Sequence, residues 1–442
     1  MPPVVNHRVI LSRAWPLILA NSSVPLLGLA DTAVLGNFGS VYDLGAIALG
    51  ALVFSFVYWG FGFLRMGTTG FIAQASGAGN EAEVRSALWR SLLIAGVIGL
   101  VLIVLQYPIG YYAFELLSGS QETESAATAY FRIRIWGAPA TLGTFALVGA
   151  LIGLGESKKL LVVQLFLNSL NISLDILFAG VMELGATGVA MGTLIAEWLA
   201  FIFAAAILVK TLRIRHKDKE DFLSLSRVMD RNKIITTLSA NTDIMIRTLL
   251  LVFAFAWFTN QSAQYGDVVL AANFILLQLI SFSAFFLDGF AFVAESFVGL
   301  AIGSRNRRTF DLAVRKTSEL AMVSAIMLTV VILVFGQYGL ALLTNIDEVY
   351  ESASASLYLA AAYVLLSFPA FQLDGVFIGA TRTAQMRNAS VIAILIYLTA
   401  WWLFTDRFGV EGLWWSFIIY VCARAVSLMY YFSALRKSIV IT

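Results

Sequence analysis

The stretch SLLIAGVIGLVLIVL, residues 91–105, contains no charged side chain and decides the fold. A helix rises 1.5 Å per residue, so about 20 residues of this kind cross a hydrocarbon core of ~30 Å. Similar stretches recur along the chain, which is 60% hydrophobic and only 13% charged, whereas soluble proteins carry about 25% charged residues. This composition excludes an ordinary soluble enzyme, a disordered chain and a nucleic-acid binder. It predicts a protein that crosses a membrane many times.

Long apolar stretches between polar breaks predict twelve transmembrane spans. In lipid, a helix satisfies every backbone polar group within one segment, so we expect an all-α polytopic membrane protein. The start of the chain, MPPVVNHRVILSRAWP, lacks the features of a cleaved signal peptide, so the first stretch is expected to be a retained span. The predicted spans are 10–36, 44–75, 85–107, 127–153, 160–181, 186–210, 233–258, 267–299, 312–335, 353–379, 387–405 and 410–434.

Basic residues predict the orientation of these spans. Most of the 29 Lys and Arg fall in alternate loops, and the intervening loops, such as NFGSVYDLG at 37–45, have none; Arg407 is the one clear exception. Cytoplasmic loops carry the excess of Lys and Arg, so both termini are expected in the cytoplasm. The basic segments are 8–13, 85–90, 158–159, 210–233, 305–316, 382–387 and 436–437.

The two halves of the sequence look like copies of one ancestor. Pro139 aligns with Pro369 and Gly153 with Gly379, at a common offset of roughly 220–230 residues that several motifs share. We therefore predict two pseudo-symmetric six-helix bundles, with a cleft between them and transport by rocking one against the other. The predicted divisions are an N-terminal lobe at 1–209, a cytoplasmic linker at 210–233 and a C-terminal lobe at 234–442. The matched motifs are LANSSVPLLGLADTAVLG (19–36) with LSANTDIMIRTLLLVFAF (238–255), GFIAQASGAGN (70–80) with AFVAESFVGLAIGSRN (291–306), and GAPATLGTFALVGALIGLGES (137–157) with SFPAFQLDGVFIGATRT (367–383).

Asp31 is the first acidic residue inside a predicted span, in VPLLGLADTAVLG. A charged carboxylate at mid-bilayer costs about 2.5–3.5 kcal/mol on insertion scales and therefore requires a reason. Pro16 and Pro25 precede it, and a proline inside a helix removes a backbone hydrogen bond and favours a bend. These prolines are candidate hinges that respond to the charge of Asp31. The alternative is a capping or interfacial aspartate near the outer end of the helix.

A second polar group lies in LNSLNISLD, where Asn168, Asn171 and Asp175 share one face of the fifth span. Thr193 adds a hydroxyl from the sixth span, beside glycines that permit close helix contact. Two amides and a carboxylate suit a proton site or an oxygen-ligand cation site. Hydrogen bonding between helices is the alternative. If Asp31 and Asp175 approach each other, they titrate as a unit and bind either H⁺ or Na⁺, and the sequence leaves this choice open.

The second lobe lacks these acids, since the repeat places Leu251 opposite Asp31 and Trp401 opposite Asp175. It carries Arg247, Asp288 and Asp374 instead, and Arg65 lies in the first lobe. An Arg247–Asp288 pair is the simplest expectation. Asp374 could line the cleft, and Arg65 could neutralise a carboxylate or extend to the membrane surface. These four residues are secondary cavity or charge-pair candidates.

Three motifs together resemble the MATE (multidrug and toxic compound extrusion) transporters, and within them the DinF-like branch. The motifs are VPLLGLADTAVLG, FLRMGTTGFIAQASGAGN and LNSLNISLDILFAGVMELGATGVAMGT. The resemblance covers nearly the whole chain. It implies a V-shaped antiporter that expels small organic, often cationic or amphipathic, compounds in exchange for H⁺ or Na⁺. It also implies coupling through the N-terminal lobe, with Asp31, Asn171, Asp175 and Thr193 at the family's positions. A monomer with no cofactor, in contact with membrane lipid, is expected.

Two other functions remain as alternatives. A lipid-linked oligosaccharide flippase of the same superfamily would need a cationic cavity for phosphates, whereas the first lobe buries acids. A membrane enzyme would need a cluster of catalytic residues, and the chain has only two His, which lie in polar segments, and one Cys. The sequence contains no Walker A motif or other nucleotide loop, so ATP-driven transport by this chain alone is not expected.

Overall fold

The computed structural model describes the backbone of residues 5–116, 121–216 and 222–439. These described residues form helices and contain no strand, which confirms the all-α class. Eleven helices among them are long and apolar enough to cross a membrane. The chain is therefore a multi-pass membrane protein.

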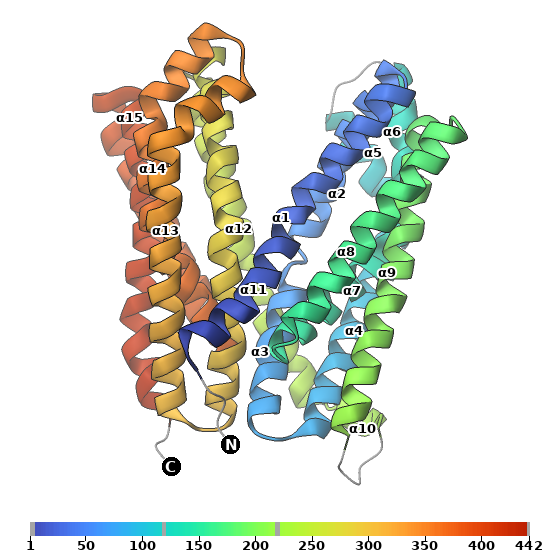
Figure 1. Ribbon diagram of the computed structural model, residues 1–442, viewed down its shortest axis with the longest axis vertical. Coiled ribbons are helices and arrows are strands. Elements are labelled where there is room, and N and C mark those ends of the chain that lie inside the picture. Colours follow the sequence, from blue (N-terminus) through green and yellow to red (C-terminus); the bar gives the residue numbers. More distant parts are fainter. Residues whose placement is uncertain (1–4, 117–120, 217–221, 440–442) are drawn as a thin grey trace. The chain divides into compact units, whose positions relative to one another are not determined.

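The first half of the chain contains nine α-helices and two short irregular ones among its described residues (Figure 1). The predicted spans 44–75, 127–153 and 160–181 each consist of more than one helical segment. The elements are α1 (His7–Phe38), α2 (Val41–Trp59), α3 (Phe63–Gly77), α4 (Glu81–Val104), α5 (Gln106–Leu116), α6 (Gln121–Arg134), the 3₁₀-helix η1 (Ile135–Gly137), α7 (Ala138–Gly153), α8 (Ser157–Asp175), the π-helix η2 (Ile176–Val181) and α9 (Gly185–Arg215).

The second half continues with α10 (Leu225–Val228), α11 (Arg231–Ala263), α12 (Asp267–Gly303), α13 (Arg307–Leu343), α14 (Asp347–Gly379) and α15 (Thr383–Ser438).

Helix α15 accounts for the difference between the eleven candidate membrane-crossing segments and the twelve predicted spans. It has 56 residues, and Gly409 within it has the non-helical angles φ 55° and ψ −130°. At 1.5 Å per residue, its length of roughly 84 Å is far more than one crossing needs. The break at Gly409 separates two arms that correspond to the predicted spans 387–405 and 410–434.

The turns between helices repeat in the two halves of the chain. Positive φ angles occur at three pairs of positions, 79 and 305, 155 and 381, and 183 and 409, and each pair is 226 positions apart. Asn80 and Asn306, at the same separation, each cap a helix by accepting a backbone N–H three residues later. These repeated turns confirm the duplicated architecture.

The same offset corrects one detail of the predicted repeat. It places Trp257, not Leu251, opposite Asp31, and it keeps Trp401 opposite Asp175. The indole rings of Trp257 and Trp401 are in contact, with ring centroids 5.1 Å apart and planes at 84°. The position of the acidic pair in one half is thus occupied by an aromatic pair in the other.

Glycines allow helices to touch through their backbones in each half. A Cβ on Gly153 of α7 would lie 2.8 Å from the carbonyl oxygen of Thr69 in α3. The aligned residue Gly379 of α14 packs in the same way against the carbonyl of Glu295 in α12. Both contacts exclude any larger residue, which explains why this predicted pair of positions is glycine in both copies.

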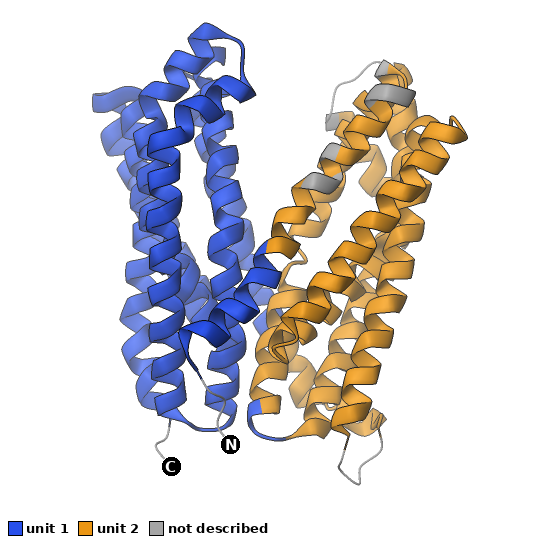
Figure 2. Ribbon diagram, in the orientation of Figure 1, with its two compact units in different colours: residues 1–18, 77–79, 238–442 blue, residues 19–76, 80–237 orange. Residues whose placement is uncertain are grey.

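The chain divides into two compact units, shown in Figure 2. We call residues 19–76 and 80–237 the first unit (orange, labelled unit 2 in Figure 2), and residues 1–18, 77–79 and 238–442 the second unit (blue, labelled unit 1 in Figure 2). The start of α1 belongs to the second unit, where the Arg13 guanidinium lies 4.5 Å from the ring centroid of Phe297. This assignment differs from the predicted lobe at 1–209.

The predicted linker 210–233 belongs to the first unit. Its first residues continue α9 to Arg215, and α10 packs against α4. Arg85 and Arg90 of α4 donate hydrogen bonds to the carbonyls of Phe222 and Arg227, at 3.1 and 3.0 Å. The described part of the linker is therefore docked on the lobe.

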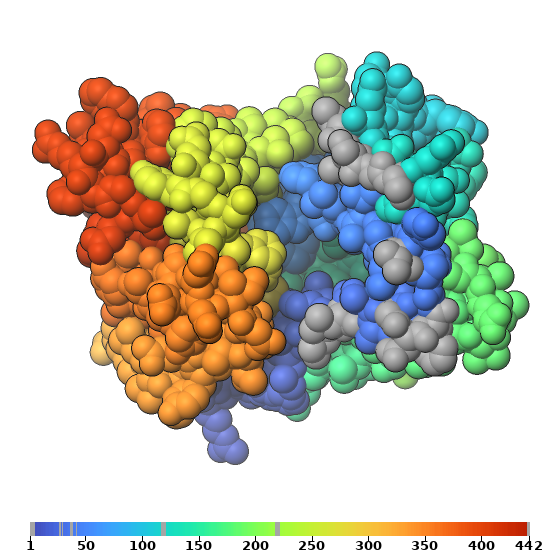
Figure 3. All heavy atoms as spheres, turned by 90° about the horizontal axis from the view of Figure 1, so that it is seen from above, coloured from blue at the N-terminus to red at the C-terminus, as the bar shows by residue number. Residues whose placement is uncertain are grey.

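The core of the second unit is apolar and rich in aromatic rings. Trp414, Phe417 and Phe258 have no exposed surface, and the ring of Phe417 stacks on that of Tyr363 at 4.7 Å. The atoms of α12 to α15 lie together in the yellow to red part of Figure 3.

Candidate functional site

Asp31 and Asp175 lie together in the first unit. Asp31 projects from α1, and Asp175 is the last residue of α8 and has no exposed surface. Their carboxyl groups are within hydrogen-bonding reach of each other. Two carboxylates cannot both remain charged at this separation without a compensating cation, so the pair is a place where H⁺ or a metal cation binds favourably. The capping alternative for Asp31 does not describe this geometry.

Asn171 and Thr193 complete the same cluster. The Asn171 amide nitrogen donates to the Thr193 hydroxyl at 3.1 Å, which joins α8 to α9. Asn171 has no exposed surface and Thr193 is buried. The bond turns the amide oxygen of Asn171 away from Thr193 and leaves it available as a ligand.

Several oxygens in this cluster receive no hydrogen bond from any described residue. They are Oδ1 of Asp31, both carboxylate oxygens of Asp175 and Oδ1 of Asn171. Buried oxygens in proteins nearly always have a partner, so an unsatisfied group of this kind requires an explanation. A proton shared by the acids, or a hard monovalent cation bound by these oxygens, provides one. No group of three or more His, Cys, Asp or Glu suited to a metal ion occurs in the described ranges.

Asn168 has a different position from the other predicted ligands. Its amide donates to the backbone carbonyl of Ser23 in α1 at 3.3 Å, and its side-chain oxygen accepts from Gln164 at 3.0 Å. Both ends of the amide therefore have partners. Asn168 ties α8 to α1 beside the candidate hinge, and the hydrogen-bonding alternative fits this residue best.

The backbone after Asp175 is wound as a π-helix. Residues Ile176–Val181 form η2, and Gly188 of α9 packs directly on the backbone of Phe178 and Ala179. Gly192, one turn further, lies under the Asp175 carboxylate, where any side chain would collide with it. π-Helical turns are rare and occur frequently at functional sites. The sequence predicted the close glycine contact, whereas nothing in it indicated the π-helix.

Sequence analysis missed a second pair of charges in this unit. Arg134, at the end of α6, donates to the Tyr130 hydroxyl at 3.0 Å and lies 3.5 Å from Glu197 of α9. Arg134 also interacts electrostatically with Asp31 and Asp175. Both residues lie inside predicted spans, so the cost of burying charge that identified Asp31 also applied to them.

In the second unit, Asp374 accepts from two arginines, Arg247 of α11 and Arg424 of α15. The sequence analysis expected Arg247 to pair with Asp288 and did not consider Arg424, whereas the structure shows both arginines paired with Asp374. The two guanidinium groups neutralise the carboxylate of Asp374, so it attracts cations poorly. Asp288 of α12 and Arg65 of α3 are half-buried, and their predicted roles, including an Arg247–Asp288 pair, stay predictions.

Pro16 and Pro25 both lie inside α1, which is helical from residue 7 to residue 38. Proline has no backbone N–H, so Pro25 leaves the carbonyl of Asn21 without its intrahelical donor. The hinge stays a prediction. Along the chain, the candidate hinge at Pro25 lies between the start of α1 and Asp31. The start of α1 belongs to the second unit.

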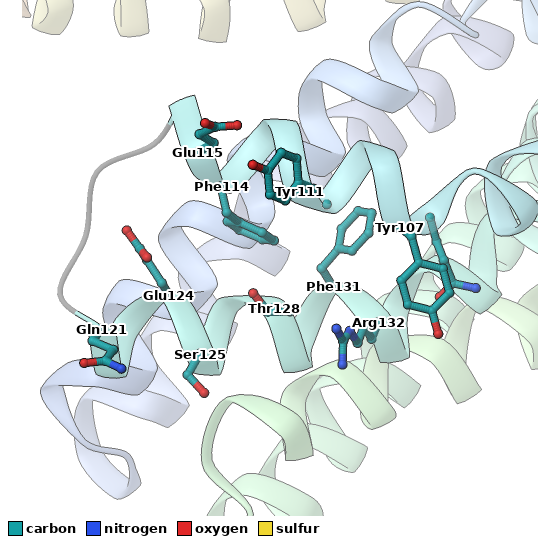
Figure 4. A pocket seen from close by; sticks show the side chains of 12 residues that line it. Tyr107, Tyr111, Phe114, Glu115, Gln121, Glu124, Ser125, Thr128, Phe131 and Arg132 are labelled. Carbon is teal, nitrogen blue, oxygen red and sulfur yellow. The ribbon is translucent and has the colours of Figure 1, made fainter.

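A cavity of about 780 Å³ lies between α5 and α6, and none of the predicted site residues lines it. Figure 4 shows side chains of both helices facing this space. Arg132 lies 5.8 Å from the ring centroid of Tyr107 across it. The lining is aromatic and acidic and includes Tyr107, Tyr111, Phe114, Glu115, Glu124 and Phe131.

Comparisons with known proteins find one family model and one relative that match most of the chain. The MatE family model matches residues 16–177 and 244–402. The chain is 33% identical over 419 residues to the DNA damage-inducible protein F of Escherichia coli (strain K12), covering 94% of this chain and 89% of that protein.

Solved structures show the same fold. A MOP-superfamily transporter from Pyrococcus furiosus, described as having a binding pocket of reverse polarity, matches with a TM-score of 0.87 at 18% identity, over 98% of this chain and 96% of that one. An outward-facing multidrug resistance MATE family transporter matches with a TM-score of 0.87 at 19% identity, over 98% of both chains.

Proposed function

Because the chain belongs to the MATE family of multidrug-efflux-type transporters, which are not enzymes, we propose that it exports small organic compounds in exchange for an inward-moving cation, H⁺ or Na⁺. One observation carries this proposal: the carboxylates of Asp31 and Asp175 lie together in the first unit with oxygens that no described donor satisfies. Such a site gains free energy from any small cation that reaches it.

The residues of the site have distinct roles in this cycle. For H⁺, the two carboxyls share the proton. For Na⁺, oxygens of Asp31, Asp175, Asn171 and Thr193 supply a hard, oxygen-only ligand set. Release of the cation on the cytoplasmic side leaves the carboxylates charged. The charged site then favours binding of a new cationic or amphipathic substrate.

The available driving force is adequate for export. One positive charge moving through ~100 mV releases about 2.3 kcal/mol, and one pH unit adds about 1.4 kcal/mol. For an uncharged substrate, their sum corresponds to a gradient of roughly a few hundred-fold. For a monovalent cationic substrate the two charges cancel, and one pH unit alone sustains a gradient of about tenfold. A cation-driven exchanger of this kind needs no nucleotide.

The cycle also needs a movement that follows the charge of the site. We assign this to bending of α1 near Pro25, with Pro16 as a second hinge, because Asn168 links α8 to Ser23 two residues before Pro25. Occupation of the site changes the charge at Asp31, on the other side of the same proline. The protein would act as a monomer in a bacterial cytoplasmic membrane, with both termini in the cytoplasm.

The test is transport of ethidium, an organic cation, into proteoliposomes under H⁺ and Na⁺ gradients that are imposed separately. We expect transport to follow one of the two gradients and to stop when that gradient is collapsed. Transport that ignores both gradients would contradict the proposal. Movement of a lipid-phosphate headgroup without any ion dependence would instead indicate a lipid-linked oligosaccharide flippase.

A further inference from the structure

Arg134 occupies a central position among the acidic groups of the first unit. Its guanidinium is paired with Glu197 and also interacts electrostatically with both Asp31 and Asp175. The side chains of Arg134 and Glu197 are 18% and 10% exposed, so solvent screens these interactions weakly. Three carboxyl groups thus share the positive charge of one arginine.

The contacts of Arg134 hold it loosely. Its Nη2 lies 3.5 Å from the Glu197 carboxylate, well beyond the distance of about 2.7–2.9 Å of a strong charge-assisted bond. Its Nε has no partner among the described residues. Its other contacts include the Tyr130 hydroxyl at 3.0 Å and the faces of Phe54 and Tyr130, whose ring centroids are 4.7 and 5.8 Å away. The guanidinium therefore has unused hydrogen-bonding capacity next to the coupling site.

The helices around Arg134 present a defined set of titratable groups. Glu197 comes from α9, Tyr58 from α2, Tyr130 from α6 itself, and the two aspartates from α1 and α8. Helix α7 contributes the uncharged hydroxyl of Thr141, which lies beside Tyr58 and Glu197. Near neutral pH the tyrosines are uncharged. The balance of charge at the site therefore depends on one arginine and three carboxyls.

We propose that Arg134 is a resident counter-cation of the coupling site, and that Glu197 controls how strongly it competes with the incoming ion for Asp31 and Asp175. This inference rests on the proposed function and adds two positioning residues to it. A guanidinium drawn toward Glu197 leaves the aspartates able to bind H⁺ or Na⁺. A guanidinium turned toward the aspartates neutralises part of their charge and helps to expel the ion.

This competition predicts opposite effects of two substitutions. Arg134→Gln removes the competing charge, so the aspartates hold their cation more tightly. Glu197→Gln releases the arginine toward the aspartates, so they hold it less tightly. A purely structural pair would lose transport in both variants without moving the ion dependence in opposite directions.

The experiment measures ethidium transport in proteoliposomes as a function of pH, or of Na⁺ concentration if the wild type follows Na⁺. We expect Arg134→Gln to raise the midpoint pH by about one to three units, and Glu197→Gln to lower it by a similar amount. For a Na⁺-driven protein, half-saturating Na⁺ falls in the first variant and rises in the second. Arg134→Lys keeps the charge and should remain near the wild-type midpoint.

The double variant tests whether Glu197 acts through Arg134. In the Arg134→Gln background, Glu197→Gln should have little further effect. Arg132→Gln is the matched control, because it removes the same charge from an exposed position on the same helix, and it should leave the midpoint unchanged.

Equal-sign shifts in the two single variants, the absence of any shift, or a Glu197→Gln effect that persists without Arg134 would each overturn the inference. If one single variant fails to fold, the direction measured for the other still decides it. A wild type that ignores both ion gradients defeats the proposed function, whereas an ion-dependent wild type with unshifted variants defeats only this inference.

Discussion

Hydrogen bonds decide which residues of the polar cluster can bind a cation. Both the nitrogen and the oxygen of the Asn168 amide form hydrogen bonds. The Asn171 amide donates from its nitrogen to Thr193, and its oxygen accepts no hydrogen bond from a described residue. The two asparagines lie on one helical face and look equivalent in sequence. Their different partners separate a residue that joins helices from one that faces the aspartates.

Thr193→Val tests the contribution of the hydroxyl at nearly constant side-chain volume. The change removes the acceptor of the Asn171 amide and leaves that donor buried, which costs about 1–3 kcal/mol. We expect the affinity of the site for its coupling ion to fall by roughly tenfold. Half-saturating ion concentration for ethidium transport gives this affinity. Thr187→Val, at a half-buried threonine of the same helix whose hydroxyl bonds the Leu184 carbonyl, should behave as the wild type, and an equal loss there would contradict the assignment.

Asp374 is the counter-charge of two buried arginines in the second unit, so its neutralisation should affect stability more than ion coupling. Asp374→Asn leaves the guanidinium groups of Arg247 and Arg424 without their shared carboxylate and should cost about 3–5 kcal/mol. Thermal unfolding of the purified protein should show a clearly lower Tm. Asp311→Asn breaks the exposed pair with Arg436 and should change Tm little. A normal Tm together with lost ion dependence would instead place Asp374 in the coupling site.

At the scale of the elements, the contact between α8, η2 and α9 positions Asp175. Gly188 and Gly192 let α9 approach the π-helix and the carboxylate closely, and the backbone N–H of Ala186 at the start of α9 bonds the Asp43 carboxylate at 2.8 Å. The hydrogen bond at the start of α9 and the two glycine contacts hold α9 against the end of α8. The position of Asp175 is thereby coupled to the packing of both helices.

Gly192→Ala tests this coupling. The added methyl group would collide with the Asp175 carboxylate, so we expect the carboxylate to be displaced and ion-driven transport to fall at least tenfold, while the protein still folds. Gly96→Ala is the control, since nothing lies within 4 Å of a Cβ at that position of α4. It should preserve transport, because alanine also favours helix more than glycine does. Unchanged ion dependence in Gly192→Ala would mean that the carboxylate position is not critical.

At the scale of the whole molecule, the distribution of basic residues predicts which loops face the cytoplasm. In a Cys422→Ser background, which removes the single cysteine, we expect Ser226→Cys in α10 to react with an impermeant maleimide only from the cytoplasmic side. Gln264→Cys, in the loop between α11 and α12, should react only from the outside. Labelling of both positions from one side would contradict the predicted topology.

The sequence predicted the spans and the duplication because both depend on local hydropathy and on turns that repeat along the chain. It predicted Asp31 and Asp175 as partners because a buried acid is costly and the chain has few of them. It did not foresee that Arg247 and Arg424 share Asp374, because ion pairs between helices depend on how those helices rotate and pack. The exact repeat offset also depended on loop lengths, which is why Trp257 replaced Leu251 opposite Asp31.

Sequence reasoning also missed Arg134 and Glu197, although a usable signal was present. Tyr130 and Arg134 are four residues apart on α6, as are Thr193 and Glu197 on α9, so each pair shares a helical face. Two charges inside predicted spans, each four residues from a polar partner, indicate a buried network. The π-helix had no such signal, because an inserted backbone turn reflects packing against Gly188.

The central claim is that Asp31 and Asp175 together hold the ion that is exchanged for substrate. Its most direct test is the flux of that ion when proteoliposomes are given only an ethidium gradient. The wild type and Asp175→Asn are compared with the control Glu156→Gln, which changes a half-buried acid paired with Lys159 just before α8. We predict that the wild type and Glu156→Gln move H⁺ or Na⁺ against the direction of ethidium, and that Asp175→Asn abolishes this counterflow. Counterflow of wild-type size in Asp175→Asn would contradict the claim.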